Sequence, residues 1–268
     1  GVQQDRVGWN IGVGSPNVLS ELGFRSTSIK GQVDLTYTTS DRKWLAHGRI
    51  GYGGIVSGTV RDQDFSQSNR QGLFSSSVSD AGGHDVQSYF GEAGYRLLDA
   101  PRGSLALLVG YRYDQQRFQI EDGRQEVPPG GADLSRLNSS YTAKWTGATL
   151  GALVELPVSS LPLKVELTGH FWPSVSYRGT GRWNLRSDFS QTPSFQHDAT
   201  GYGGDLGIRL RYQPTEHWDV SIGWAGTWLI AEDGTDKTFF SNGTTGTADL
   251  NRVDSRTNFY SFGIGYRW

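Results

Sequence analysis

The chain has 268 residues, a formal net charge of −2 at pH 7, 37 glycines, and neither cysteine nor methionine. Without cysteine it forms no disulfide, no zinc–thiolate site and no thiol nucleophile, and its near-neutral charge gives no sign of nucleic-acid binding. No stretch approaches the roughly 18 apolar residues of a membrane-spanning helix, although barrel strands alternate and therefore average out as polar. Because residue 1 is not methionine, we expect that a signal peptide has been removed.

Ten strands are predicted from residues that alternate between apolar and polar. The alternation is clearest near the C-terminus, where Tyr260, Phe262 and Ile264 alternate with Ser261 and Gly263. A period of two predicts strands rather than helices. The predicted strands, in chain order, are 6–14, 24–39, 44–60, 84–98, 104–121, 140–157, 163–181, 198–213, 218–232 and 256–268.

Three features favour a membrane barrel over a soluble sandwich. Full charges occupy the polar face in mid-strand, as Lys164 and Glu166 do. Aromatic residues gather at strand ends, as interfacial girdles require, at Trp44, Tyr113, Tyr177, Tyr212, Trp218, Tyr266 and Trp268. Short connections (40–43, 99–103, 159–162, 214–217) alternate with long ones near 15–22, 66–83, 123–139, 185–196 and 235–254. We therefore predict an all-β fold, a single ten-stranded antiparallel transmembrane β-barrel over 1–268, with short periplasmic turns and long extracellular loops in the bacterial outer membrane.

The same alternation predicts which side chains face the inside of the barrel. At ten strands the lumen is narrow, so inward side chains should fill most of it. Their charges are of both signs, which indicates a paired ion network rather than an open selective pore. The predicted inward set is Lys30, Asp34, His47, Arg49, Glu92, Arg96, Arg112, Asp114, Glu155, Lys164, Glu166, His170, Asp205, Arg209 and Arg211.

The segment RDQDF (61–65) places two carboxylates, Asp62 and Asp64, at the top of the third strand. Together with LSELGF (19–24) and GGHDVQSYFGEAGYRLLD (82–99), it resembles the omptins, ten-stranded outer-membrane aspartyl proteases of Gram-negative bacteria. The resemblance implies that the two aspartates face an Asp–x–His pair at the top of strand seven. Together the pairs would activate a water, with the histidine accepting its proton. The resemblance also implies bound lipopolysaccharide.

The chain departs from the omptin pattern at the top of strand seven. The segment SYRGTGRWNLR (176–186) has no histidine and no acid, but it has Arg178, Arg182 and Arg186. We expect these arginines to pair with the two aspartates of RDQDF and to depress their pKa values. They are also candidates for contacts with lipopolysaccharide phosphates.

Two histidines are candidates for the missing base. His84 follows the loop that Asp64 enters, and His197 at the start of strand eight could act with Asp198 or Asp188. The orientation of the aspartates is itself open. If side chains alternate strictly along strand three, Asp62 and Asp64 point outward. A bulge in GYGG (51–54) would shift this alternation by one residue and turn them inward.

Three functions follow from these observations. The preferred reading is a non-catalytic omptin-like barrel that acts through its extracellular loops in adhesion, surface binding or envelope structure. The alternatives are a divergent omptin-like aspartyl endopeptidase, using Asp62 and Asp64 with His84 or His197, and a small pore. We expect no metal and no cofactor, with lipopolysaccharide as the bound lipid. The expected partners are outer-membrane lipid and a surface protein, and not nucleic acid.

Overall fold

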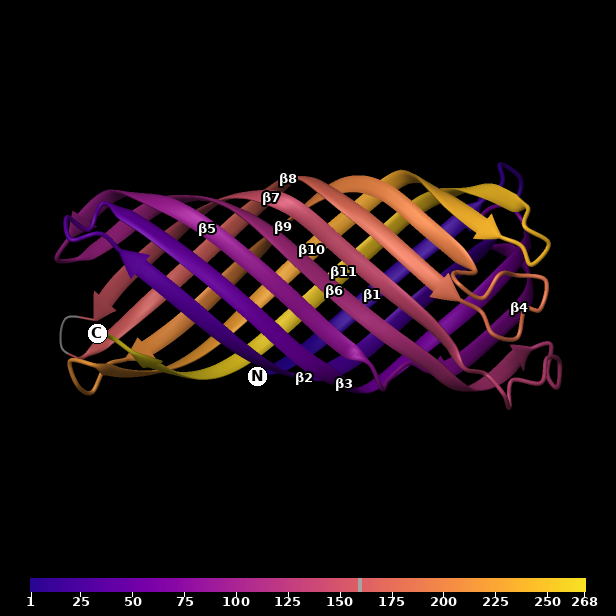
Figure 1. The fold of residues 1–268 in the computed structure, drawn as a ribbon, viewed down its shortest axis with the longest axis horizontal. Helices are drawn as coiled ribbons and strands as arrows, with labels where there is room; N and C mark the ends of the chain where they lie inside the picture. The colour runs from indigo at the N-terminus through magenta and orange to yellow at the C-terminus, as the bar shows by residue number, and fades with distance from the viewer. Residues whose placement is uncertain (159–160) are drawn as a thin grey trace.

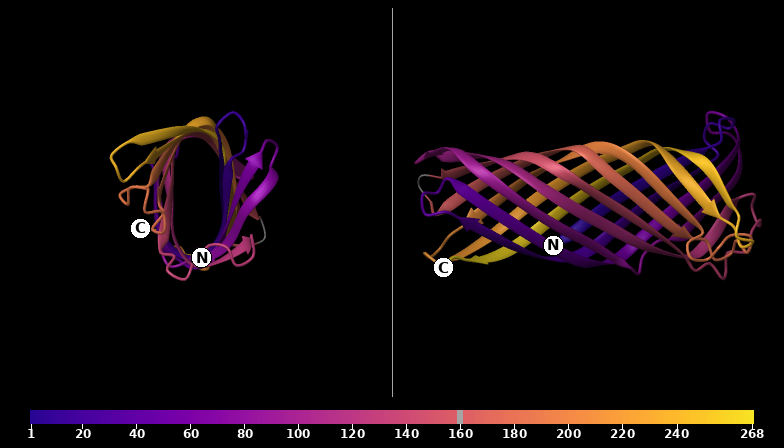
Figure 2. Two further views of the ribbon diagram at one scale, coloured as in Figure 1. Left: turned by 90° about the vertical axis from the view of Figure 1, so that its right-hand side faces the viewer. Right: turned by 45° about the horizontal axis from the view of Figure 1, so that its top comes forward.

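A computed structural model describes residues 1–158 and 161–268 as one antiparallel sheet closed into a barrel (Figure 1). β2 pairs with both β1 and β3, and β6 pairs with β5, so the ring closes; its wall is oval in the end-on view of Figure 2. The strands are β1 (Val2–Gly12), β2 (Ser20–Thr38), β3 (Trp44–Gln67), β4 (Gln71–Asp80), β5 (Asp85–Ala100), β6 (Gly103–Val127), β7 (Ser139–Val158), β8 (Leu163–Arg182), β9 (Phe195–Tyr212), β10 (Trp218–Phe239) and β11 (Thr245–Tyr266). The predicted all-β antiparallel barrel is confirmed. No helix in the described residues is long and apolar enough to cross a membrane.

The eleven strands fill ten places in the ring, because β4 and β5 share one of them. Both pair with β3 on one side and β6 on the other, and only 81–84 separate them. The predicted loop 66–83 is therefore mostly strand, and so is the predicted loop 235–254, in which β10 and β11 leave only 240–244 as a turn. These two loop predictions are wrong because the rim hairpins are rich in Ser, Thr, Asp, Asn and Gly, so their composition resembles that of a loop, although Phe65, Leu250 and Val253 are buried in them.

The two ends of the barrel differ in their connections. The short turns after β2, β5 and β9 lie at one end, on the left of Figure 1, and the longer connections lie at the other. The predicted turn 159–162 falls partly outside the described residues. We call these the short-turn end and the loop end. β11 ends at the short-turn end, whereas β1 starts partway up the wall, where Val2 pairs with Ile29 and Tyr260.

Apolar side chains form a belt on the outer face of the half nearest the short turns. Such a band is the surface that a barrel presents to lipid. On β2 it begins at Ile29, whereas Arg25, nearer the loop end, is an outward polar residue. The apolar belt includes Ile29, Val33, Leu35, Ile50, Tyr52, Leu107, Val109, Tyr111, Leu150, Leu206, Ile222, Tyr260, Phe262 and Ile264, all exposed on the outer face.

Bulges in β3 and β8 reverse the side of the strand that faces inward. In β3 the register with β2 slips between Ile55 and Ser57, and Val56 is left outward. In β8 it slips across Pro173, whose missing N–H suits a bulge. Above that bulge Val175 and Tyr177 point inward and are fully buried, so the prediction that Tyr177 belongs to an interfacial girdle is wrong.

Candidate functional site

The two aspartates of RDQDF face the inside of the barrel near its loop end. The bulge at Val56 turns them inward. It lies just beyond GYGG (51–54), the segment in which the sequence suggested a bulge. Asp62 and Asp64 lie opposite Leu22 and Ser20 of β2. In the described part of the chain, Asp62 Oδ1 is buried without a hydrogen-bond partner.

The aspartates share an environment that favours protonation. Burial raises the pKa of Asp62 to about 8, and the charge of Asp64 adds to the effect. Burial also raises the pKa of Asp64, against the hydroxyls of Ser20 and Ser75 and the charge of Arg186. Two close carboxylates that are poorly solvated hold one proton between them. The expectation that arginines would depress both pKa values is therefore wrong.

Arg178, Arg182 and Arg186, at and after the end of predicted strand seven (β8), have other partners. The bulge in β8 turns Arg178 to the outer face, where its Nε lies 2.7 Å from Asp198 Oδ1. Arg182 donates to the backbone oxygen of Asn138 over 2.6 Å. Arg186 lies in the connection after β8 and forms a two-bond ion pair with Asp188, at 2.9 and 2.8 Å. Of the three, only Arg186 is close enough to influence Asp64. In the described residues none of them forms an ion pair with Asp62 or Asp64, so the predicted pairing is wrong.

The two candidate histidines are not placed alike. His84 lies exposed in the linker between β4 and β5, where its carbonyl accepts the Ile55 N–H. Asp62 is seven residues farther along β3 than Ile55, which is roughly 23 Å at 3.3 Å per residue. The structure therefore does not bring His84 to the aspartates.

His197 points inward from β9 and is completely buried. Its Nδ1 lies 3.1 Å from the Tyr141 hydroxyl, and its Nε2 lies 3.2 Å from Asp236 Oδ1 on β10. It contacts neither of the acids suggested by sequence, since Asp198 and Asp188 pair with arginines. The partnership with Asp236 was missed because that residue was assigned to a loop.

At the top of β8, aromatic rings take the space where inward side chains would lie. The inward positions there are Gly179 and Gly181, on the same face as Tyr177. A Cβ at Gly179 would collide with the Tyr141 hydroxyl, and one at Gly181 would collide with the Phe195 ring. An Asp–x–His pair has no room at these positions.

Tyr141 belongs to an aromatic plug that fills the barrel on the loop-end side of the belt, and Phe195 packs beside it with ring centroids 6.1 Å apart. Phe24 stacks on Phe118 and Tyr141 with ring centroids 4.5 and 5.4 Å apart, and Trp145 packs on Tyr177 at 4.5 Å. These side chains come from β2, β6, β7 and β8, so they meet across the lumen. We define the aromatic plug as Phe24, Phe118, Tyr141, Trp145, Trp172 and Tyr177, each under 2% exposed.

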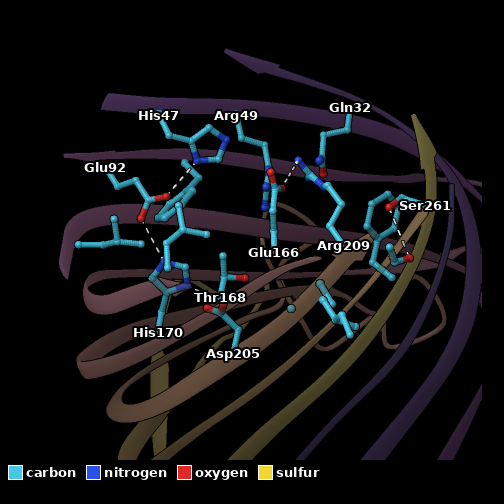
Figure 3. A pocket seen from close by; sticks show the side chains of 18 of the residues that line it. Gln32, His47, Arg49, Glu92, Glu166, Thr168, His170, Asp205, Arg209 and Ser261 are labelled. Carbon is cyan, nitrogen blue, oxygen red and sulfur yellow. Dashed lines mark hydrogen bonds and ion pairs between the residues drawn. The ribbon is translucent and has the colours of Figure 1, made fainter. Parts of the chain in front are cut away.

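Below the plug, the predicted ion network is present. Figure 3 shows part of it around a cavity of about 210 Å³, with side chains from β2, β3, β5, β8, β9 and β11. The pairs include Arg49–Asp34, Arg96–Glu155, Arg112–Asp114, Lys164–Glu155 and Arg211–Glu166, at 2.6 to 3.3 Å. The prediction of paired charges facing inward is confirmed.

Two histidines in this network each bridge two carboxylates. His47 lies 3.0 Å from both Asp34 and Glu92, through its two ring nitrogens. His170 lies 3.1 Å from Glu92 and 2.8 Å from Asp205. An ionised carboxylate only accepts, so a ring bonded to two of them donates from both nitrogens and is positively charged. The charged cluster (Asp34, His47, Glu92, His170, Asp205) is thus a chain of alternating charge.

Comparisons with known proteins agree with this architecture. Residues 1–267 match the model of the Protochlamydia outer membrane protein (Pom) family, and the chain belongs to that family. No curated protein matches it. The outer membrane protease OmpT from Escherichia coli is similar in structure, with a TM-score of 0.82 at 12% identity over 100% of this chain and 94% of OmpT. The translocator domain of the autotransporter NalP from Neisseria meningitidis gives 0.39 at 17% identity over 100% of this chain and 86% of NalP. The omptin-like outer-membrane fold is therefore confirmed, and this likeness shows the fold alone.

Proposed function

We propose that the chain is a closed, non-catalytic outer-membrane barrel whose extracellular rim serves in envelope structure, adhesion or surface binding. The observation that carries the proposal is the occupation of the barrel mouth by aromatic rings. Gly179 and Gly181 accommodate Tyr141 and Phe195 where a water-activating pair would need to project. A general base must lie within hydrogen-bond reach of the water it activates. His197 is completely buried, with Nδ1 hydrogen-bonded to the Tyr141 hydroxyl and Nε2 held 3.2 Å from Asp236 Oδ1.

For a protein partner, we propose a rim surface at the loop end. The β3–β4 hairpin exposes Leu73 and Phe74 near its turn, at 38% and 52% of their surface. Exposed apolar residues on a protruding hairpin favour contact with another protein. We propose lipopolysaccharide as a bound lipid, with contacts from Arg178, Arg182 and Arg186. The outward position of Arg178 supports this proposal, because its guanidinium lies on the outer wall.

A peptide-cleavage assay tests the absence of catalysis. The refolded barrel, supplied with lipopolysaccharide, is incubated with a mixed peptide library, and products are read by mass spectrometry. The double variant Asp62→Asn/Asp64→Asn serves as the control, and folding is checked by heat-modifiable migration on a gel. We expect no cleavage from either protein. Cleavage by the wild type that disappears in the double variant would overturn the proposal.

One observation favours the alternative, a divergent aspartyl endopeptidase. Asp62 and Asp64 combine a raised pKa with a buried carboxylate oxygen that has no partner among the described residues. Titratable groups perturbed in this way are common at active sites. If this alternative holds, His197→Ala should reduce cleavage, whereas His84→Ala should leave it unchanged, because of these two histidines only His197 faces the interior.

A further inference from the structure

Three arginines lie side by side on the outer wall of the barrel. Arg6 of β1 pairs in register with Arg256 of β11 on one side and with Arg25 of β2 on the other. All three are exposed. Residues directly opposite in a sheet have Cβ atoms about 5 Å apart, and like charges at that spacing repel. This arginine row therefore costs the protein stability unless something neutralises it.

No ion pair in the described ranges 1–158 and 161–268 neutralises the row. None of its members forms an ion pair or a side-chain hydrogen bond there. Other outward arginines differ in this respect. Arg252 lies on the same strand as Arg256 and pairs with Glu232 at 3.1 Å, and Arg61 pairs with Glu126 at 2.7 Å.

The row lines a groove of about 800 Å³ on the outer wall. Trp228 stands opposite Arg256 at one end, and Thr59 stands opposite Arg25 at the other. The rest of the lining includes polar and small residues (Gln4, Ser26, Thr27, Ser57, Gly58 and Asn258) and two carboxylates. Asp5 is buried on the inner face, whereas Asp80 is exposed and stands opposite Thr59, beyond the Arg25 end of the row. The three guanidinium groups outnumber the one exposed carboxylate, so the groove keeps an excess of positive charge. With its amide donors and one aromatic ring, it suits an anionic group rather than an apolar one.

The height of the row on the wall points to the source of that anion. On each of the three strands, the residue four positions nearer the short-turn end is exposed and apolar; these residues are Val2, Ile29 and Tyr260. Four residues span about 13 Å along a strand and less in height, because barrel strands are tilted. Arginine side chains can extend toward such a boundary while their stems cover apolar surface. The guanidinium groups therefore lie at the level of lipid headgroups on the loop-end side.

We infer that the arginine row binds the phosphate group of a lipid in the leaflet next to the loop end. Guanidinium groups bind phosphate oxygens through paired, charge-assisted hydrogen bonds. A bound phosphate would neutralise the three like charges, and Trp228 would contact the adjacent part of the lipid. This site lies on β1, β2 and β11, apart from the arginines of the β8 region.

Native mass spectrometry of the detergent-solubilised barrel tests the inference. The probes are diphosphorylated lipid A, the same lipid without phosphates, and inorganic phosphate. The variants are the triple Arg6→Gln/Arg25→Gln/Arg256→Gln and, as a matched control, Arg252→Gln. We expect the triple variant to bind diphosphorylated lipid A at least about tenfold more weakly, because it loses several hydrogen bonds to charged oxygens. The control variant should bind it as the wild type does.

Three outcomes would overturn the inference. One is equal binding of diphosphorylated lipid A by the triple variant and the wild type. Another is equal binding of the phosphate-free lipid, which would make the site apolar. The third is complete displacement of the lipid by millimolar inorganic phosphate, which would make it a site for the free ion.

A stability measurement separates binding from a merely structural role. Without phosphorylated lipid, the triple variant should unfold at a higher urea concentration than the wild type, since the repulsion is gone. With diphosphorylated lipid A the order should reverse, because only the wild type gains from the ligand. A triple variant that is less stable under both conditions would contradict the inference.

Discussion

The two halves of the barrel interior are built from opposite chemistry. Near the short turns the lumen holds charged side chains around a cavity of about 210 Å³. Near the loop end it holds the aromatic plug, with six rings that are each under 2% exposed. The outer face shows the reverse, apolar beside the charged half and polar beside the plug. Within the belt the barrel is therefore polar inside and apolar outside. Above the belt it is apolar inside and polar outside, as a soluble protein is.

The contrast explains how one closed sheet is stable in two solvents. Inside the belt lipid covers the outer wall, so the lumen can be polar provided that its charges are paired. Above the belt both sides would be wet, and the wall needs an apolar core of its own. Asp205 joins the halves, since it pairs with His170 below and accepts a hydrogen bond from Trp172 Nε1, at 2.8 Å, above.

Removal of a ring from the plug should have the largest effect. Trp145 is fully buried, so Trp145→Ala leaves a cavity and should lower the free energy of unfolding by about 3–5 kcal/mol. Trp145→Phe should cost much less, because the indole Nε1 has no hydrogen-bond partner in the described residues. Urea titration of the refolded barrel measures both. A loss below about 1 kcal/mol for Trp145→Ala would mean that the plug is not a packed core.

Breaking the charged cluster should cost slightly less. Asp205→Asn removes the carboxylate that His170 and Arg112 contact at 2.8 and 3.5 Å. Removal of one partner of a buried pair leaves an uncompensated charge, so we expect a loss of about 3 kcal/mol in the same titration. The amide can still accept the Trp172 hydrogen bond, which isolates the effect of charge. An unchanged midpoint would show that water in the cavity replaces the carboxylate.

The aspartates above the plug should make stability depend on pH. The pKa of Asp62 is raised by burial and by Asp64, so the folded chain holds this proton more tightly than the unfolded chain. Its contribution to stability is therefore present below the unfolded pKa of about 4 and is lost as pH rises through the folded value of about 8. Asp62→Asn should stabilise the barrel at pH 8 by on the order of 1–2 kcal/mol and have almost no effect at pH 4. Destabilisation by the variant at pH 8 would reverse the sign and refute this account of the pair.

The smallest effect should come from the outer wall. The Arg178–Asp198 pair is 60% and 46% exposed, so Arg178→Ala should change the free energy of unfolding by less than about 0.5 kcal/mol. Raising the salt concentration should abolish even that difference, because exposed charges are screened. A larger loss would indicate that Arg178 has a partner that stabilises the fold.

Much of the fold was predictable because alternation is a strong local signal. The belt and the paired charges of the short-turn half follow from residues such as Phe262 and Lys164, whose neighbours reverse polarity at each step. The upper half was less predictable. In β7 the inward Tyr141 has the same parity as the inward Glu155, and only the polarity of the two faces is reversed. In β3 and β8 the bulges at Val56 and Pro173 also shift the pattern by one residue, which brings Tyr177 inside.

The candidate site shows the same limit. The carboxylate pair of Asp62 and Asp64 was found from its motif, but its inward orientation depends on one extra residue in β3. The neighbours of His197 come from β1, β7 and β10, and such contacts follow from strand register rather than from spacing in sequence. The glycines at 179 and 181 were the one available hint, since they recur on a single face where large rings need space.

Single-channel recording in planar bilayers tests most directly whether the barrel is closed. Folded wild-type protein, verified by its heat-modifiable migration on a gel, is inserted, and current is recorded under an applied voltage. The plug predicts no discrete conductance steps above the bare bilayer. Reproducible open steps of uniform size from the folded wild type would contradict the closed barrel and establish the small pore in its place.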